Sequence, residues 1–208
     1  MDQPPPQADA TPSPPPSRDT PPRLRAGRSW SAIIVFAVVA MAILVGDLAL
    51  KYVSFRTVAG VPVQLDPAHP GAGIPLHDPV EVVPYILSLR LTANTGAVFG
   101  SMAGWRWVFV VITFIAVAVI FRVFWRSRAD AWVFHLGLAL ILGGALGNLY
   151  DRLRYSAVRD MLWLFPETRL WPWLFNLADA ALMVGVGLVI LMMWLNEMRP
   201  RNAEATPH

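Results

Sequence analysis

Residues 131–150 read AWVFHLGLALILGGALGNLY and contain no Asp, Glu, Lys or Arg. A helix rises about 1.5 Å per residue, so it needs about 20 such residues to cross roughly 30 Å of hydrocarbon. Apolar runs of similar length occur at residues 30–50, 105–124 and 173–195. The sequence therefore predicts an all-α integral membrane protein with four transmembrane helices.

The composition of the chain agrees with this prediction. Of its 208 residues, 55% are hydrophobic and only 15% are charged, whereas about a quarter of an ordinary soluble domain is charged. All nine tryptophans lie at or beyond the ends of the four apolar runs, which is typical of an aromatic belt at the membrane surface. The composition therefore disfavours a water-soluble globule.

The charges and the missing cysteines exclude several kinds of site. With no cysteine in the chain, there is no thiol nucleophile, disulfide or cysteine-ligated zinc. The net charge of +3 comes mainly from arginine, and no basic run resembles a nucleic-acid footprint. We therefore expect membrane lipid around this chain and no nucleic-acid partner.

The two ends of the chain differ in composition from its middle. Residues 1–29 contain PPPQ, PSPPPS and TPPRLR. Because such a stretch cannot bury enough apolar surface, we expect a disordered proline-rich tail. Residues 30–196 are predicted to form the membrane domain, and residues 197–208 a second tail.

The orientation follows from the positive charges next to the spans. Arginines gather at residues 23–28, 122–128 and 199–201, which all belong to one side of the membrane. The total charge barely separates the two sides, with nine Arg on this side and seven Arg plus Lys51 on the other. The positive-inside rule counts residues close to span ends, and by that count it favours cytoplasmic termini. The other connections, and any site that they carry, are then expected at the extracytoplasmic face.

Two extracytoplasmic connections join the spans on that face. Hydrophobic residues alternate with smaller or polar ones at 61–65 and at 87–91, which predicts short half-buried strands. The stretch between them, DPAHPGAGIPLHDP, is typical of a loop. We therefore expect a small extracytoplasmic β-sheet. The second connection, residues 151–172, contains Asp160 and the aromatic run LWLFP.

Acidic residues within the spans are candidate functional residues, because a charge within hydrocarbon is costly. Asp47, Asp151 and Asp179 all lie toward the extracytoplasmic ends of their spans. Asp179 follows Trp173 by six residues, which places it ~9 Å below the membrane surface at about 1.5 Å per residue. This depth suits a carboxyl group that acts on a substrate at the level of the lipid headgroups.

Two N-x-x-D patterns place an amide beside a carboxylate. Asn148 and Asp151 end one span, Asn176 and Asp179 begin another, and Arg152 follows Asn148 by four residues. Residues at i and i+3 share one face of a helix. These groups either form a site or hydrogen-bond neighbouring helices to one another, and the spacing alone leaves both interpretations open.

Four segments of the sequence resemble a known family. They are NTGAVFG at 94–100, GGALGNLYDR at 143–152, VRDML at 158–162 and FNLADAAL at 175–182. Their order and spacing resemble those of the lipoprotein signal peptidases, also called signal peptidase II. The resemblance covers about residues 30–195. It implies an intramembrane aspartyl endopeptidase that removes the signal peptide of a prolipoprotein before its diacylglyceryl-modified cysteine.

The resemblance also assigns roles to individual residues. The family's catalytic pair falls on Asp160 in VRDML and on Asp179 in FNLAD. The supporting polar positions fall on Asn94, Asn148, Arg152, Asn176, Asp47 and Lys51. The resemblance implies diacylglyceryl-modified prolipoproteins as substrates, no metal ion or organic cofactor, and a location in the bacterial cytoplasmic (inner) membrane. We expect a monomer.

Two positions depart from the family's pattern. Asp47 is followed by Leu48 where the family usually has Gln, although Lys51 keeps the family's spacing. Arg159 stands at a position that is more often apolar, immediately before Asp160. Its guanidinium is expected to point away from the catalytic carboxyls.

A different class of function would use the same acids. Asp47, Asp151 and Asp179 would line a polar path in a small proton-coupled transporter or relay protein. Such a relay also needs ionisable groups near the opposite side of the bundle, where only His135 comes close. A cleavage assay with a diacylated substrate distinguishes the two classes.

Overall fold

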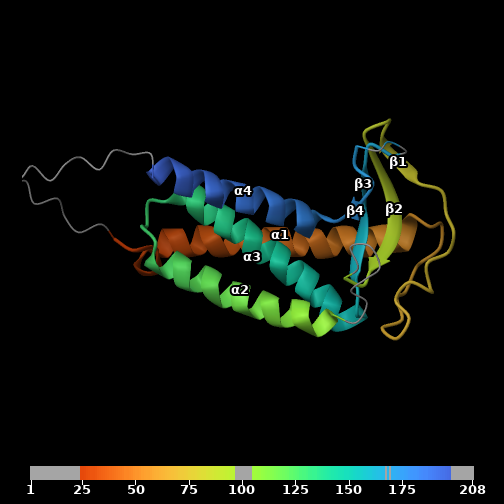
Figure 1. Cartoon of the computed structure of the whole chain (residues 1–208), viewed down its shortest axis with the longest axis horizontal. Helices are drawn as coiled ribbons and strands as arrows, with labels where there is room; N and C mark the ends of the chain where they lie inside the picture. The colour runs from red at the N-terminus through yellow and green to blue at the C-terminus, as the bar shows by residue number, and fades with distance from the viewer. Residues whose placement is uncertain (1–23, 97–104, 167, 169, 198–208) are drawn as a thin grey trace, which may run out of the picture.

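The computed structural model describes residues 24–96, 105–166, 168 and 170–197. Its long helices are α1 (Trp30–Thr57), α2 (Arg106–Arg126), α3 (Trp132–Tyr155) and α4 (Leu177–Glu197), preceded by the short 3-10 helix η1 (Ala26–Arg28). Its strands are β1 (Val80–Val83), β2 (Leu87–Asn94), β3 (Val158–Leu164) and β4 (Leu174–Phe175). The helices lie along the long axis of the molecule and the sheet lies across one end (Figure 1). We call this end the sheet end, and the opposite end, where α1 begins and α4 finishes, the terminus end.

All four predicted spans are present as helices. Each of the four long helices is long and apolar enough to cross a membrane. Many large apolar side chains on their outer faces are exposed, among them Ile34, Ile115 and Ile190, as expected for surfaces that face lipid. The fourth helix begins at Leu177 and not at residue 173, because Leu174 and Phe175 pair with β3 in the sheet.

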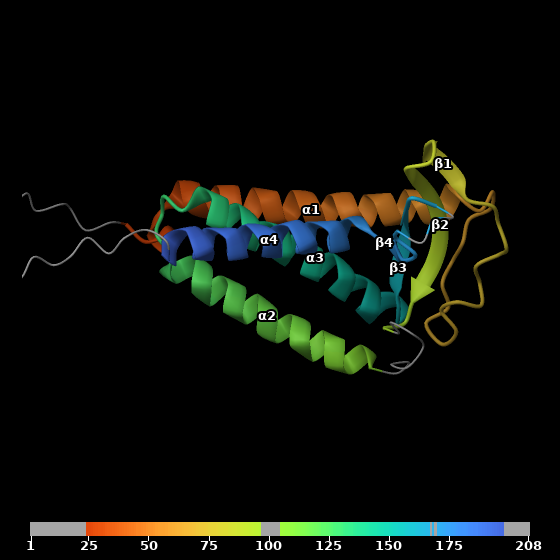
Figure 2. The same ribbon diagram turned by 45° about the horizontal axis from the view of Figure 1, so that its top comes forward.

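Helix α3 is the central helix of the bundle and contacts the other three (Figure 2). Its glycines let neighbouring backbones come close. A Cβ atom at Gly144 would lie 2.5 Å from the Ala178 carbonyl oxygen of α4, and one at Gly147 would lie 2.5 Å from Asp47 Oδ2 of α1. Small residues thus bring the acid of α1 and the start of α4 together at the sheet end of α3.

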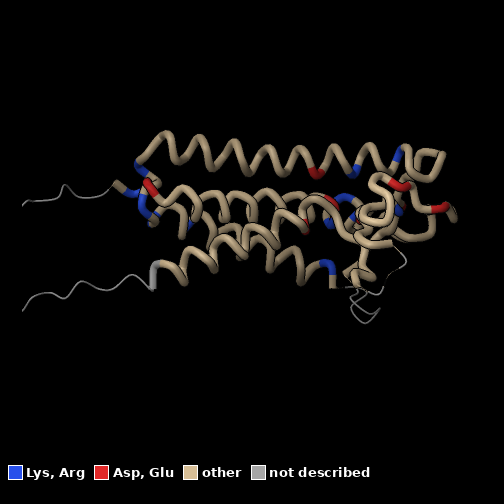
Figure 3. The backbone as a smooth tube through the Cα atoms, turned by 90° about the horizontal axis from the view of Figure 1, so that it is seen from above, with Lys and Arg blue, Asp and Glu red and all other residues tan. Residues whose placement is uncertain are grey.

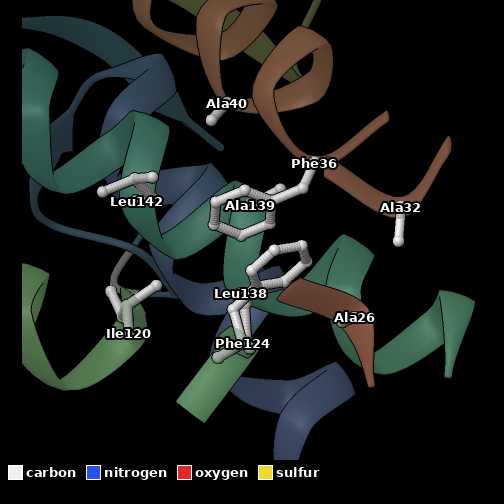
Figure 4. Close-up of a cluster of buried hydrophobic side chains, with 9 residues drawn as sticks. All are labelled: Ala26, Ala32, Phe36, Ala40, Ile120, Phe124, Leu138, Ala139 and Leu142. Atoms are coloured by element: carbon white, nitrogen blue, oxygen red, sulfur yellow. The ribbon is translucent and has the colours of Figure 1, made fainter. Parts of the chain in front are cut away.

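A compact apolar cluster holds the helices together at the terminus end (Figure 4). The rings of Phe36 in α1 and Phe124 in α2 stack with centroids 4.2 Å apart. The buried members of this cluster are Ala26, Ala32, Phe36, Ala40, Ile120, Phe124, Leu138, Ala139 and Leu142. The buried acids of the spans, Asp47 and Asp151, lie away from this cluster, toward the sheet end.

The sheet has four antiparallel strands in the order β1-β2-β3-β4. The predicted strand at 87–91 lies within β2, but the predicted strand at 61–65 is wrong. Val63 and Leu65 are buried as their alternation indicated, yet this segment pairs with the end of α1, where the Val63 N–H donates to the Phe55 carbonyl at 2.7 Å. Burial of every second side chain does not require a strand partner.

Strand β3, which carries the VRDML segment, was not predicted. Its residues 158–161 are all buried, so the alternation that marks a half-buried strand is absent. In the sheet, Asp160 is paired with Thr92, and Val158 with Asn94. This register brings the side chains of Asn94 and Asp160 together.

The last residues of the predicted proline-rich tail are ordered. Residues 24–29, which we expected to be disordered, are held against the connection between α2 and α3. The Ala26 N–H donates to the Ser127 carbonyl, and the Ala129 N–H donates to the Leu24 carbonyl, both at 2.9 Å. These bonds and the complete burial of Ala26 offset the cost of ordering the segment. Residues 1–23 and 198–208, on which the rest of the tail predictions fall, lie outside the described residues.

Candidate active site

Asp160 and Asp179 come from different elements at the sheet end. Asp160 lies in the middle of β3 and is 1% exposed, while Asp179 lies in the first turn of α4. Acidic and basic positions gather toward the two ends of the bundle (Figure 3). The two aspartates thus meet where the sheet rests on the ends of α3 and α4.

Asn176 contacts both aspartates. Its side-chain Nδ2 donates to Asp160 Oδ1 at 2.6 Å. Its backbone N–H donates to Asp179 Oδ2 at 3.2 Å, while its own Oδ1 accepts from the Asp179 N–H at 2.9 Å. This reciprocal pair is the capping-box geometry of a helix N-terminus. The second N-x-x-D pattern is therefore a helix cap that also reaches the other aspartate.

Two further amides complete the contacts of the aspartates. Asn94 Nδ2 donates to Asp160 Oδ2 at 3.2 Å, and Asn148 Nδ2 donates to Asp179 Oδ1 at 2.7 Å. Asn148 Oδ1 in turn accepts from Asn176 Nδ2 at 3.2 Å. All four carboxylate oxygens have a hydrogen-bond donor, so the structure brings these five predicted site residues into one network.

The surroundings of Asp160 change its proton affinity. Burial, and then the negative charge of Asp179, raise the pKa of Asp160 from its ordinary value of 3.8 to about 7. Hydrogen bonds from Asn176 and Asn94 act in the opposite direction. A carboxyl group with this pKa holds its proton up to neutral pH and is suited to general-acid catalysis.

Lys51 lies behind this network and is completely buried. Its Nζ is 2.7 Å from Asp47 Oδ2 and 3.2 Å from Asp151 Oδ2, and it donates to Asn148 Oδ1 at 3.0 Å. Asp47 Oδ1 also accepts from the Ala178 N–H of α4 at 2.9 Å. Lys51 and Asp47 therefore position Asn148 and the start of α4, and neither has a hydrogen bond to Asp160 or Asp179 in the described structure.

This arrangement can be compared with known proteins. Residues 39–195 match the family model of signal peptidase (SPase) II. The chain belongs to the signal peptidase II family. The resemblance inferred from the four sequence segments is thereby confirmed.

Individual relatives of the signal peptidase II family agree with this assignment. Over 125 residues the chain is 40% identical to the lipoprotein signal peptidase of Desulfitobacterium hafniense (strain DSM 10664 / DCB-2), covering 60% of this chain and 80% of that protein. Over 168 residues it is 34% identical to the lipoprotein signal peptidase of Geobacter metallireducens, covering 79% of this chain and 93% of that protein.

Solved structures share the fold. A bacterial membrane enzyme determined by the in meso method at 1.9 Å resolution superposes with a TM-score of 0.64 and 25% identity, over 77% of this chain and 93% of that one. A second such enzyme structure, at 2.3 Å resolution, gives a TM-score of 0.67 at 24% identity, over 84% and 96% of the two chains. Both structures are similar to this chain over most of its four helices and its sheet.

Arg159, which departs from the usual signal peptidase II pattern, turns away from the two aspartates as expected. Its Nε and Nη2 donate to Asp151 Oδ1 at 3.1 and 2.8 Å, and its backbone N–H donates to Asp151 Oδ2 at 3.0 Å. The N-x-x-D spacing pairs Asp151 with Asn148 and gives no sign of this partner. The signal that could have found it is the unusual arginine itself, since a buried charge needs a counter-charge.

Arg152 lies at the edge of the site. Its Nη1 donates to the Asn148 carbonyl at 3.5 Å, and its guanidinium lies 4.9 Å from the centre of the Phe109 ring in α2. Among the described residues it has no hydrogen bond to a carboxylate. In the described structure its side chain therefore does not hold the aspartates.

Proposed function

We propose that Asp160 and Asp179 are the catalytic pair of this signal peptidase II family member. In this proposal the enzyme removes the signal peptide of prolipoproteins by hydrolysing the peptide bond before the diacylglyceryl-modified cysteine. The observation that supports it most directly is the position of Asn176, which hydrogen-bonds to both carboxylates. One residue therefore sets the relative placement of the two groups.

Ionising both of two neighbouring carboxyl groups costs electrostatic repulsion, so the pair holds a single proton over a broad pH range. Asp160 carries that proton, in keeping with its pKa of about 7. Asp179, in the first turn of α4, is then the partner without a proton. The measured pKa values will belong to the pair.

The hydrolysis uses a water molecule between the two groups. Ionised Asp179 takes a proton from this water, whose oxygen attacks the scissile carbonyl carbon. Protonated Asp160 polarises the carbonyl oxygen. The C–N bond then breaks and the leaving amine takes up a proton from the pair. Asn94 and Asn148 hold the carboxylates in place, and Arg152 contacts the substrate backbone.

The membrane position of the site suits a lipid-modified substrate. The bundle is apolar along its length, and the aspartates lie at the sheet end. The diacylglyceryl chains would lie in lipid beside the helices, while the peptide bond reaches the level of the aspartates. Both termini are cytoplasmic in this proposal, and the sheet end faces the extracytoplasmic side.

The transporter alternative receives no comparable support. Asp47 and Asp151 are engaged by Lys51 and Arg159 in buried ion pairs. His135, the candidate near the other side, hydrogen-bonds with Ser127 Oγ at 2.8 Å. The same side chains that a relay would need are therefore occupied in holding the helices together.

The decisive experiment is a cleavage assay with the purified chain in detergent. The substrate is a peptide with a lipobox and a diacylglyceryl-modified cysteine, and the control is the same peptide without the diacylglyceryl group. We expect cleavage before the modified cysteine and little cleavage of the control. Failure to cut the diacylated peptide, by protein shown to be folded, would overturn the proposed activity.

A further inference from the structure

A pocket lined by arginines lies at the terminus end, far from the aspartates. It has a volume of about 580 Å³ and is formed where η1 meets the last turns of α2. Its lining residues are Arg25, Gly27, Arg28, Arg122, Trp125 and Arg126. We call it the arginine pocket. We propose that it binds the phosphate of an anionic phospholipid headgroup.

Among the described residues, no acid compensates the positive charge of the arginine pocket. None of its four arginines has an ion pair or a side-chain hydrogen bond with a carboxylate among the described residues, and no acid lines the pocket. Arg128, a few residues further along the chain, differs, because its Nη2 and Nε donate to the two oxygens of Asp130 at 2.6 and 3.0 Å. Within the described part of the chain, the pocket therefore offers guanidinium groups without an acidic partner that can bind an anion from outside.

The pocket is built by specific backbone contacts. The hydrogen bonds of Leu24 and Ala26 to the connection after α2 hold η1 in place. Gly27 packs so closely on the Trp125 indole that a Cβ atom at this position would overlap the ring. Arg25 and Arg28, on either side of Gly27 in the sequence, thereby line the pocket together with the two arginines of α2.

The chemistry and the position of the pocket both indicate a phospholipid. The pocket lies at the end of the membrane-spanning helix α2, and its Trp125 is half exposed, as is usual for tryptophan at headgroup level. Basic positions gather at this end of the bundle (Figure 3). Guanidinium groups bind phosphate oxygens in a bidentate manner, and basic pockets beside transmembrane helices bind anionic headgroups. A zwitterionic headgroup fits less well, because the described lining of the pocket has no carboxylate to pair with its ammonium group.

The test measures phospholipid binding to the purified full-length chain in detergent. Phosphatidylglycerol, phosphatidylcholine and inorganic phosphate are titrated separately, and retained lipid is counted by native mass spectrometry. We expect phosphatidylglycerol to bind more tightly than phosphatidylcholine, and inorganic phosphate to compete only weakly. Equal binding of the two lipids, or complete displacement by equimolar inorganic phosphate, would overturn the proposal.

Charge variants locate the site. Each arginine near the membrane surface contributes about a fivefold gain in affinity for anionic lipid. Arg126→Gln should therefore weaken phosphatidylglycerol binding roughly fivefold. The double variant, which also carries Arg122→Gln, should weaken it roughly 25-fold. Arg128→Gln removes the same charge from the same end but outside the pocket, and should leave binding unchanged. An equal loss in the Arg128 variant would show only diffuse attraction and would contradict a site.

A glycine variant tests the geometry without any change of charge. Gly27→Ala places a methyl group in the Trp125 ring and should disturb the pocket, so that phosphatidylglycerol binding weakens. Gly187→Ala is the matched control, since a Cβ there meets no atom within 4 Å. Cleavage of the diacylated peptide reports whether each variant is folded. Unchanged lipid binding in a folded Gly27 variant would overturn the proposed geometry.

Discussion

The side-chain amide of Asn176 donates a 2.6 Å hydrogen bond to Asp160 Oδ1. Asn176 is also the residue that caps α4, so the start of this helix is tied to the middle of β3 by a single side chain. Asp179, three residues further along, shares the cap through its backbone and its carboxylate. The placement of one aspartate relative to the other therefore depends on a helix cap.

Replacing either aspartate by asparagine should abolish cleavage while leaving the protein folded. Asp160→Asn and Asp179→Asn each remove one half of the proton-sharing pair, and a lost acid–base group costs about 10²–10⁴-fold in rate. The rate of cleavage of a diacylated peptide is the measurement. Asp78→Asn, at an exposed carboxylate on the loop before β1, is the control and should retain activity. Near-normal turnover by either the Asp160 or the Asp179 variant would contradict their assignment as the catalytic pair.

The activity should fall as the pH rises through about 7, because Asp160 then loses the proton that it supplies as the acid. The Asn94 amide favours the ionised form of Asp160, so Asn94→Ala should raise the pKa of Asp160 and move the alkaline limb to higher pH. The pH profile of kcat/KM for the two proteins measures this shift. A limb that moves to lower pH in the variant would contradict the assigned roles.

The pH dependence of protein stability also reports the protonation of Asp160. Folded Asp160 keeps its proton up to about pH 7, whereas in the unfolded chain the group loses it near the ordinary pKa of 3.8. Between these two pH values the folded state binds more protons than the unfolded state. The contribution of Asp160 to the free energy of unfolding is therefore fully present below pH 3.8 and decreases as the pH rises toward 7. The thermal midpoint of Asp160→Asn should vary less over this pH range than that of the wild type.

Much of this arrangement follows from sequence, and the exceptions have physical reasons. Apolar runs long enough to span a membrane can fold only as helices there, so the four spans were predictable. The strand that carries Asp160 was not, because buried residues on both of its faces remove the alternation of a half-buried strand. The two N-x-x-D patterns look alike, yet they act differently in the fold. Asn176 and Asp179 share one helix cap. Asn148 instead hydrogen-bonds to Asp179. Asp151 forms ion pairs with Lys51 and Arg159. Tertiary partners decided between them, and local spacing does not contain that information.

Lys51 is predicted to be needed for stability more than for chemistry. Lys51→Met leaves the buried carboxylates of Asp47 and Asp151 without their shared cation. Removing one partner of a buried ion pair costs about 3–5 kcal/mol, so the thermal midpoint in detergent should fall sharply. Arg90→Met, which removes an exposed arginine from β2, is the control. A Lys51 variant with wild-type stability and no cleavage would instead assign Lys51 a direct part in the reaction.

Cleavage should persist in EDTA and after treatment with a thiol alkylating agent. The chain has no cysteine to alkylate, and the described residues contain no group of three His, Asp or Glu side chains placed to hold a metal ion. The assay is cleavage of the diacylated peptide before and after each treatment, with a zinc peptidase as a positive control for chelation. Activity lost in EDTA and restored by added zinc would contradict a mechanism based on the two carboxyls.

Shortening the N-terminal tail should have two different effects, depending on where the chain begins. A chain that starts at Leu24 keeps η1 and its backbone hydrogen bonds to the connection after α2. It should insert and cleave normally, because the aspartates lie at the opposite end of the bundle. A chain that starts at Trp30 loses Arg25 and Arg28, two of the positive charges on which the proposed orientation rests, together with the buried Ala26. We expect partly inverted topology for this shorter chain, measured by the accessibility of a C-terminal tag from each side of the membrane. Lost specific activity in the correctly inserted chain that starts at Leu24 would show that residues 1–23 take part in catalysis or in substrate docking.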